Sequence, residues 1–143
     1  MFQRILVPLD GTALAEEALP IAAQLARVTS AELLLLRVVT RPFEQDMLAM
    51  EPEVFVERPR EADVAEARTY LTHVITYKHL DGLKVRAEVL KGPPAQSILH
   101  FAHTAHVDLV IVRSHGETGL KRWFVGSMAQ QFVRFSSIPL LIL

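Results

Sequence analysis

Residues 112–127 read V-R-S-H-G-E-T-G-L-K-R-W-F-V-G-S, a stretch that leaves an apolar run and enters the start of a helix. Its glycines permit positive φ and close approach of the backbone to a ligand. They are Gly116, Gly119 and Gly126. Ser127 and Gln130 have the spacing of a capping box, and a helix start there favours an anion such as phosphate. The stretch predicts a strand–loop–helix unit with an anion-binding loop, and the alternative is the same unit with no ligand.

The rest of the chain alternates short apolar runs with segments of helical periodicity. We expect strands at 4–9, 32–39, 84–90, 107–112 and 138–143. We expect helices at 12–28, at 61–79, from residue 94 to about 105, and at 127–135. The second strand contains the long apolar run L-L-L-L-R-V-V at 33–39, which is typical of a central strand, and the third alternates, which is typical of a strand near a sheet edge. Pro20 should bend the first helix, because it removes one backbone hydrogen bond.

Strands that alternate with helices predict a doubly wound α/β domain with a mainly parallel sheet and helices on both faces. In such sheets ligands bind beyond the carboxyl ends of the strands, where the strand order reverses. The first expected strand is followed by Asp10, and the fourth is followed by the glycine-containing loop at 113–127. If these two strands are neighbours in the sheet, Asp10 and this loop face each other.

The amino-acid composition limits the classes of protein and of partner that are expected. The 143 residues are half apolar and suffice for one domain, which we place at 1–143. The formal net charge of −1 provides no field for nucleic acid or an anionic membrane, so neither is expected as a partner. Cysteine is absent, and no apolar run reaches membrane-spanning length. We therefore expect a soluble cytoplasmic protein.

Two other segments have candidate functions. Residues 40–60 contain three prolines and no sustained period, so we expect a long loop that packs over a ligand or is anchored to the core. Three histidines at steps of three would share one side of the helix that begins near residue 94; they are His100, His103 and His106. A solvated helix face explains them without a metal, and no carboxylate at ligand spacing completes a site. No metal site is predicted.

Catalysis has little support in the sequence. Asp10 and His115 are candidates for an acid–base pair, yet the chain has no nucleophile elbow and no phosphate loop with its lysine. We expect a binding protein and not an enzyme.

Several motifs together carry a resemblance to a known family. They are I-L-V-P-L-D-G-T at 5–12, R-V-V at 37–39, K-G-P-P-A-Q-S-I-L at 91–99, D-L-V-I-V-R-S-H-G at 108–116 and I-P-L-L-I-L at 138–143. In these motifs the chain resembles the universal stress protein family from end to end. The resemblance implies a five-stranded sheet in the order 3-2-1-4-5 with two helices on each face. It also implies a homodimer that pairs Ile138–Leu143 with its two-fold mate.

The resemblance further implies ATP as a ligand, with Mg²⁺ as its companion ion. The positions that match the nucleotide-binding residues of the family are Pro8, Leu9, Asp10, Val38, Val112, Arg113, His115, Gly116, Gly126, Ser127, Met128 and Ala129. Ala129 lacks the hydroxyl that ATP-binding relatives offer to a phosphate.

Arg113 departs from the family signature, which reads Gly, two residues, Gly, nine residues, Gly, then Ser or Thr. The last three elements fit at Gly116, Gly126 and Ser127, but Arg113 stands in place of the first glycine. Its side chain either fills the phosphate position, held by Asp10, or swings aside and donates to the phosphate. We expect weaker ATP binding than in relatives with the full signature, and tighter binding in Arg113→Gly.

Two hypotheses from different classes therefore remain open. One is a regulatory protein that binds an adenine nucleotide, which sets the conformation of residues 40–60. The other is a nucleotide-free, dimeric interaction protein of the same fold, in which Arg113 blocks the phosphate loop.

Overall fold

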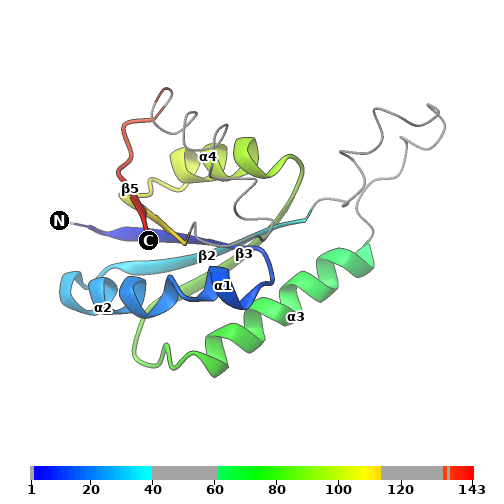
Figure 1. Cartoon of the computed structure of the whole chain (residues 1–143), viewed down its shortest axis with the longest axis horizontal. Helices are drawn as coiled ribbons and strands as arrows, with labels where there is room; N and C mark the ends of the chain where they lie inside the picture. The colour runs from blue at the N-terminus through cyan, green and yellow to red at the C-terminus, as the bar shows by residue number, and fades with distance from the viewer. Residues whose placement is uncertain (1, 40–60, 114–133, 135) are drawn as a thin grey trace.

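Among the residues that the structure describes, five strands form one parallel sheet in the order β3-β2-β1-β4-β5 (Figure 1). The computed structural model describes residues 2–39, 61–113, 134 and 136–143. The predicted fold class and strand order are therefore confirmed. The predicted helix at 127–135 and the predicted loop at 40–60 lie outside the described residues, apart from residue 134.

The central strand is β1 (Arg4–Leu9), and its position explains its continuous apolar sequence. It pairs in parallel with β2 (Glu32–Val39), from Arg4 opposite Glu32 to Leu9 opposite Arg37. On its other side it pairs in parallel with β4 (Leu109–Val112). The last five residues of β1 are all buried, as expected for a strand covered on both faces.

The two edge strands differ in character. At one edge, β3 (Val85–Lys91) is partly exposed and carries charged residues, in agreement with the alternation in its sequence. At the other edge, β5 (Leu140–Ile142) pairs with β4 and is wholly apolar. Only β3 has the charges that commonly protect an open sheet edge from pairing with another chain.

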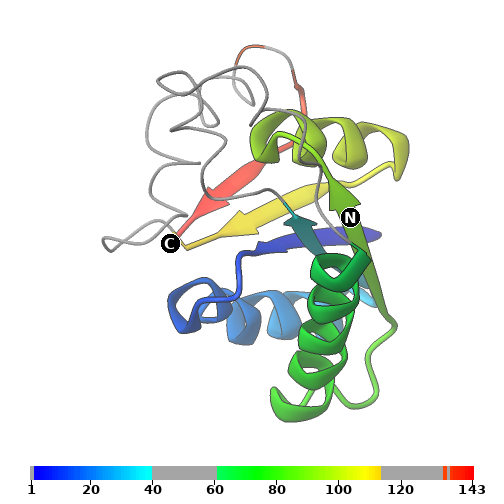
Figure 2. The ribbon, with the colours of Figure 1, turned by 90° about the vertical axis from the view of Figure 1, so that its right-hand side faces the viewer.

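The described helices cover the two faces of the sheet. On one face lie α1 (Ala13–Glu16), α2 (Leu19–Thr29) and α3 (Glu61–Tyr77), and on the other lies α4 (Pro94–Thr104) (Figures 1 and 2). Pro94 occupies the first turn of α4, as predicted. No described helix combines the length and hydropathy needed to span a bilayer.

The prediction of one bent helix over 12–28 is wrong. The chain makes two helices, since α1 ends at Glu16 and α2 begins at Leu19. Pro20 therefore lies in the first turn of α2. The first N–H groups of a helix have no intrahelical partner, so the missing N–H of a proline costs least there. The proline marks the start of a second helix and not a bend within one.

Candidate functional site

The strand order places the candidate site at the end of the sheet where the carboxyl ends of the strands lie. From β1 the chain moves to β2 and β3 on one side, and later to β4 and β5 on the other, so the order reverses between β1 and β4 (Figure 2). These two strands are parallel neighbours, so their carboxyl ends lie side by side at the same end of the sheet. Asp10 directly follows β1, and Arg113 directly follows β4. The expectation that both ends meet at the reversal of strand order is confirmed.

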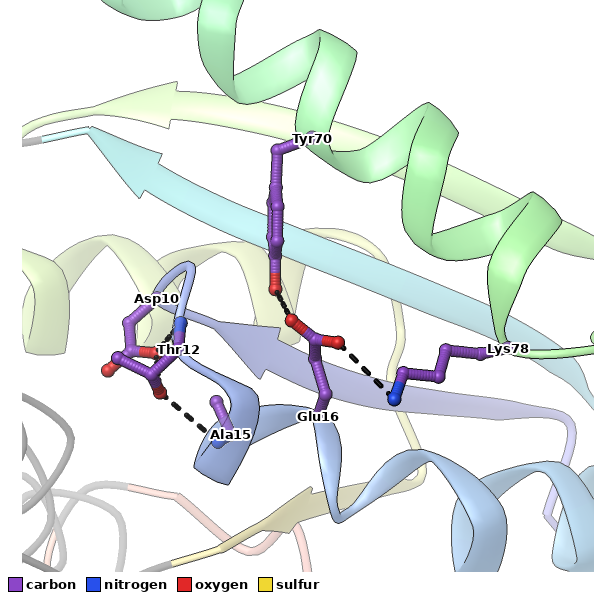
Figure 3. Close-up of polar contacts among 6 residues, drawn as sticks. All are labelled: Asp10, Thr12, Ala15, Glu16, Tyr70 and Lys78. Atoms are coloured by element: carbon purple, nitrogen blue, oxygen red, sulfur yellow. Dashed lines mark hydrogen bonds and ion pairs between the residues drawn. The ribbon is translucent and has the colours of Figure 1, made fainter.

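Asp10 is held by the turn that follows β1. The backbone N–H of Thr12 donates to Oδ1 of Asp10 at 2.9 Å, and the Thr12 hydroxyl donates to the same oxygen at 2.6 Å (Figure 3). The Thr12 hydroxyl also accepts from the N–H of Ala15 at 3.2 Å and so caps α1. Gly11 takes φ of +89° between them, a conformation that favours glycine. The turn therefore fixes the direction of the carboxylate.

The other carboxylate oxygen of Asp10, Oδ2, has no donor among the described residues. This oxygen is also buried. A buried carboxylate oxygen without a donor is costly, and an N–H or O–H group of a ligand would relieve that cost. This oxygen is a hydrogen-bond acceptor beside the reversal point of the sheet.

Arg113 pairs with a carboxylate that the sequence did not single out. Its Nε lies 3.2 Å from Oε2 of Glu17, the residue that follows α1, in an ion pair without a well-aligned hydrogen bond. The partner is Glu17 and not Asp10, which was the partner expected for an inward arginine. Glu17 is about half exposed and Arg113 about one-third exposed. We call this contact the Arg113–Glu17 bridge.

The structure brings together half of the predicted site positions. They are Pro8, Leu9, Asp10, Val38, Val112 and Arg113, at the carboxyl ends of β1, β2 and β4. The four apolar side chains of this set are buried, so they form the base of the site. The other positions lie outside the described residues; they are His115, Gly116, Gly126, Ser127, Met128 and Ala129.

Arg37 is a nearby cation that was not among the expected site positions. It stands opposite Leu9 in the register of β1 and β2. Its guanidinium lies beside Gly11: a Cβ built on that glycine would be 3.7 Å from Nη2 of Arg37. Its Nη1 donates to the carbonyl of Val38 at 3.2 Å. The available signal was the single charge within the apolar run of β2.

A polar cluster fastens α1 to α3 beside this end of the sheet. The Tyr70 hydroxyl donates to Oε2 of Glu16 at 2.8 Å, and Nζ of Lys78 lies 3.5 Å from Oε1 of Glu16 (Figure 3). Burial raises the pKa of the Tyr70 phenol, and the hydrogen bond to Glu16 and the charges of Glu16 and Asp10 raise it further. The guanidinium of Arg37 opposes this shift. No signal in the sequence links these residues, which lie far apart along the chain.

The geometry suits a small ligand that carries both a hydrogen-bond donor and a negative charge. Asp10 provides an acceptor, and cations are provided by Arg37 on β2 and by Arg113 after β4, the two strands that flank β1. Across the described ranges, no group of three or more metal-ligating side chains is placed to hold a metal ion. His115, the other half of the candidate acid–base pair, falls outside them.

Comparison with known sequences gives a family for the whole chain. The model of the universal stress protein family matches residues 1–143. Universal stress protein YxiE of Bacillus subtilis is 30% identical over 146 residues, which cover 99% of this chain and 99% of that protein. Universal stress protein MJ0531 of Methanocaldococcus jannaschii is 29% identical over 143 residues, which cover 99% of this chain and 82% of that protein.

Comparison with solved structures gives the same fold. MJ0577, a universal stress protein of Methanocaldococcus jannaschii, superposes with a TM-score of 0.75 at 26% identity, over 100% of this chain and 96% of that one. A universal stress protein in complex with cAMP gives 0.64 at 20% identity, over 99% and 96% of the two chains. One from Archaeoglobus fulgidus in complex with dAMP gives 0.67 at 16% identity, over 99% and 97%. The last two likenesses concern the fold alone.

Proposed function

The chain belongs to the universal stress protein family, and on that premise we propose that it is a stress-response protein that binds an adenine nucleotide, ATP, at the carboxyl ends of β1 and β4. Mg²⁺ accompanies the nucleotide in this proposal. The protein acts by binding and not by catalysis.

One observation carries the proposal. Asp10 stands at the reversal of strand order with one oxygen fixed by Thr12 and the other buried without a described partner. An adenine amino group or a ribose hydroxyl is the kind of donor that this oxygen lacks. The cations Arg37 and Arg113 lie at the same end of the sheet and suit the phosphates of the same molecule.

The relatives add support of a different kind. The two complexes named above hold cAMP and dAMP, and both ligands contain adenine, ribose or deoxyribose, and phosphate. Those ligands belong to those proteins. They make an adenine nucleotide the first ligand to test here.

The test is equilibrium binding of a fluorescent ATP analogue to the purified protein, with and without Mg²⁺. Asp10→Asn keeps the size of the side chain but replaces a charged acceptor, and we expect it to weaken binding about tenfold or more. Asp81→Asn is the matched control, because Asp81 is exposed and precedes β3 in the chain. It therefore lies near the amino ends of the parallel strands, away from their carboxyl ends. Asp81→Asn should leave binding unchanged. Equal binding by Asp10→Asn and the unmodified protein would contradict the proposed site.

The same measurement tests the departure at position 113. We expect Arg113→Gly to bind ATP more tightly than the unmodified protein, because it removes a side chain from the end of β4 and restores the signature glycine. Tight binding that is lost in this variant would instead identify Arg113 as a phosphate ligand.

The second candidate function is a nucleotide-free interaction protein of the same fold. The Arg113–Glu17 bridge favours it, because the bridge joins the two segments that leave the reversal point. Under this alternative no adenine nucleotide binds at millimolar concentration, and Arg113→Gly does not restore binding.

A further inference from the structure

We propose that the Arg113–Glu17 bridge holds the nucleotide site closed, so that Glu17 sets the affinity without itself touching the ligand. The inference rests on the proposed function. It assigns a role to Glu17, which matches none of the expected ligand positions.

The position of the bridge is the first part of the argument. Arg113 is the first residue after β4, and Glu17 is the first residue after α1, which follows β1 through the turn at Asp10. Because β1 and β4 are neighbours, the ion pair connects the two segments that leave the reversal of strand order. In this proposal, a ligand that enters between these segments to reach Asp10 separates the pair.

The anchoring of the Glu17 side is the second part. The backbone N–H of Glu17 donates to the carbonyl of Leu14 at 3.1 Å, which ends α1. The preceding residue, Glu16, is held by Tyr70 and Lys78 from the α3 side. The carboxylate of Glu17 therefore extends from a fixed backbone. When the bridge is formed it ties β4 to α1.

The charges around the site favour Glu17 as the partner of Arg113. Glu16 has Tyr70 and Lys78 as partners, and one oxygen of Asp10 is already held by Thr12. Within the described ranges, the carboxylate of Glu17 forms an ion pair with Arg113 alone, and both side chains are partly open to solvent. Ion pairs of this exposure are weak, so a ligand can displace the bridge at a modest loss of affinity of about two- to fivefold.

The experiment is a double-mutant cycle on the full chain. Glu17→Gln and Arg113→Gln each remove one charge of the bridge and keep a side chain of similar length. Binding of ATP and of uncharged adenosine is measured by calorimetry for the unmodified protein, both single variants and the double variant. Asp81→Asn is again the control for a lost carboxylate. Thermal melting confirms that each variant is folded.

The bridge predicts a specific pattern in this cycle. Glu17→Gln should tighten ATP and adenosine by about two- to fivefold, because either ligand must open the bridge in the unmodified protein. The double variant should gain no more than Glu17→Gln alone for adenosine, because the bridge can be broken only once. Asp81→Asn should bind like the unmodified protein. The gain should shrink at high salt, which screens the pair.

Other patterns overturn the inference. Tighter binding of ATP but not of adenosine would mean that Glu17 only repels phosphate. Additive gains for adenosine would mean that the two side chains act separately, and weaker binding in Glu17→Gln would mean that Glu17 supports the ligand. If the unmodified protein and every variant fail to bind either ligand, the proposed function fails, whereas measurable binding that ignores Glu17 rejects the bridge alone.

Discussion

Tyr70 reaches from α3 to Glu16 and helps to hold α1 in position. A helix of four residues is too short to be stable by itself, so α1 depends on contacts from outside. Thr12 caps its start, and Tyr70 and Lys78 hold its end through Glu16 (Figure 3). Because Asp10 and Glu17 flank α1, these contacts also position the candidate site.

We predict that Tyr70→Phe lowers the free energy of unfolding by about 1 kcal/mol at neutral pH, because Glu16 loses a hydrogen bond. The difference in the free energy of unfolding between the unmodified protein and Tyr70→Phe should become smaller in alkali. The pKa of the Tyr70 phenol is raised above the ordinary value of 10.0, so above that pH the unfolded chain releases a proton that the folded chain keeps. The stability that this residue contributes is therefore complete below pH 10 and declines as the pH rises further.

Urea denaturation at about pH 8 and about pH 11 checks this prediction, through the difference between the unmodified protein and Tyr70→Phe. Tyr77→Phe is the matched control, because that side chain is 67% exposed. A difference that stays constant or widens in alkali would contradict the assigned role of Tyr70.

At the scale of residues, the sequence predicted those site positions that belong to a local pattern. Asp10 lies in a turn after an apolar run, whereas Arg113 stands out only against the glycine signature of the family that the chain resembles. The partners of these residues were not predictable in the same way. Glu16 and Tyr70 meet only because α1 and α3 lie on the same face of the sheet, and Glu17 meets Arg113 only because β1 and β4 are adjacent.

Among the elements, the separation of α1 from α2 has the clearest consequence for stability. We predict that Pro20→Ala changes the free energy of unfolding by less than about 1 kcal/mol, because the proline lies in the first turn of α2 and removes no helical hydrogen bond. Gln24→Pro, at an exposed position inside the same helix, should cost about 3 kcal/mol. Urea denaturation of both variants provides the comparison. A large loss in Pro20→Ala would show that the ring itself supports the break.

Elements were easier to predict than their boundaries. The strands and the described helices appear where hydrophobic periodicity placed them, because burial on one or both faces leaves a regular pattern in the sequence. The break at Glu17 and Ala18 left no such pattern. Helical spacing continues across it, and the contact that holds the end of α1 comes from Tyr70 on α3, which lies outside the local sequence.

For the whole molecule, the unprotected edge at β5 leads to a proposal about assembly. We propose that the protein is a homodimer through Ile138–Leu143. Leu140–Ile142 is apolar, and Ile142 remains 45% exposed in the single chain. An open apolar edge of this kind favours pairing with a second copy. We predict that Leu141→Asp converts the dimer to a monomer, as measured by light scattering at micromolar concentration.

Val28→Asp is the matched control for this prediction, because Val28 is the most exposed large apolar side chain among the described residues, at 77%, and lies on α2. It should leave the dimer intact. An unmodified protein that is already monomeric, or a Leu141→Asp variant that stays dimeric, would remove β5 from the interface.

The strand order also has a consequence for how the chain folds during synthesis. β1 can pair with β2 soon after both leave the ribosome, but its other edge must wait for β4, whose first contact with β1 joins Ile5 to Leu109. At roughly 5–20 residues per second, that wait lasts several seconds. During it the central, largely apolar strand β1 has an unpaired edge, which is a feature that recruits chaperones and promotes aggregation. The nascent chain is therefore most vulnerable before the residues that complete its ligand site have been made.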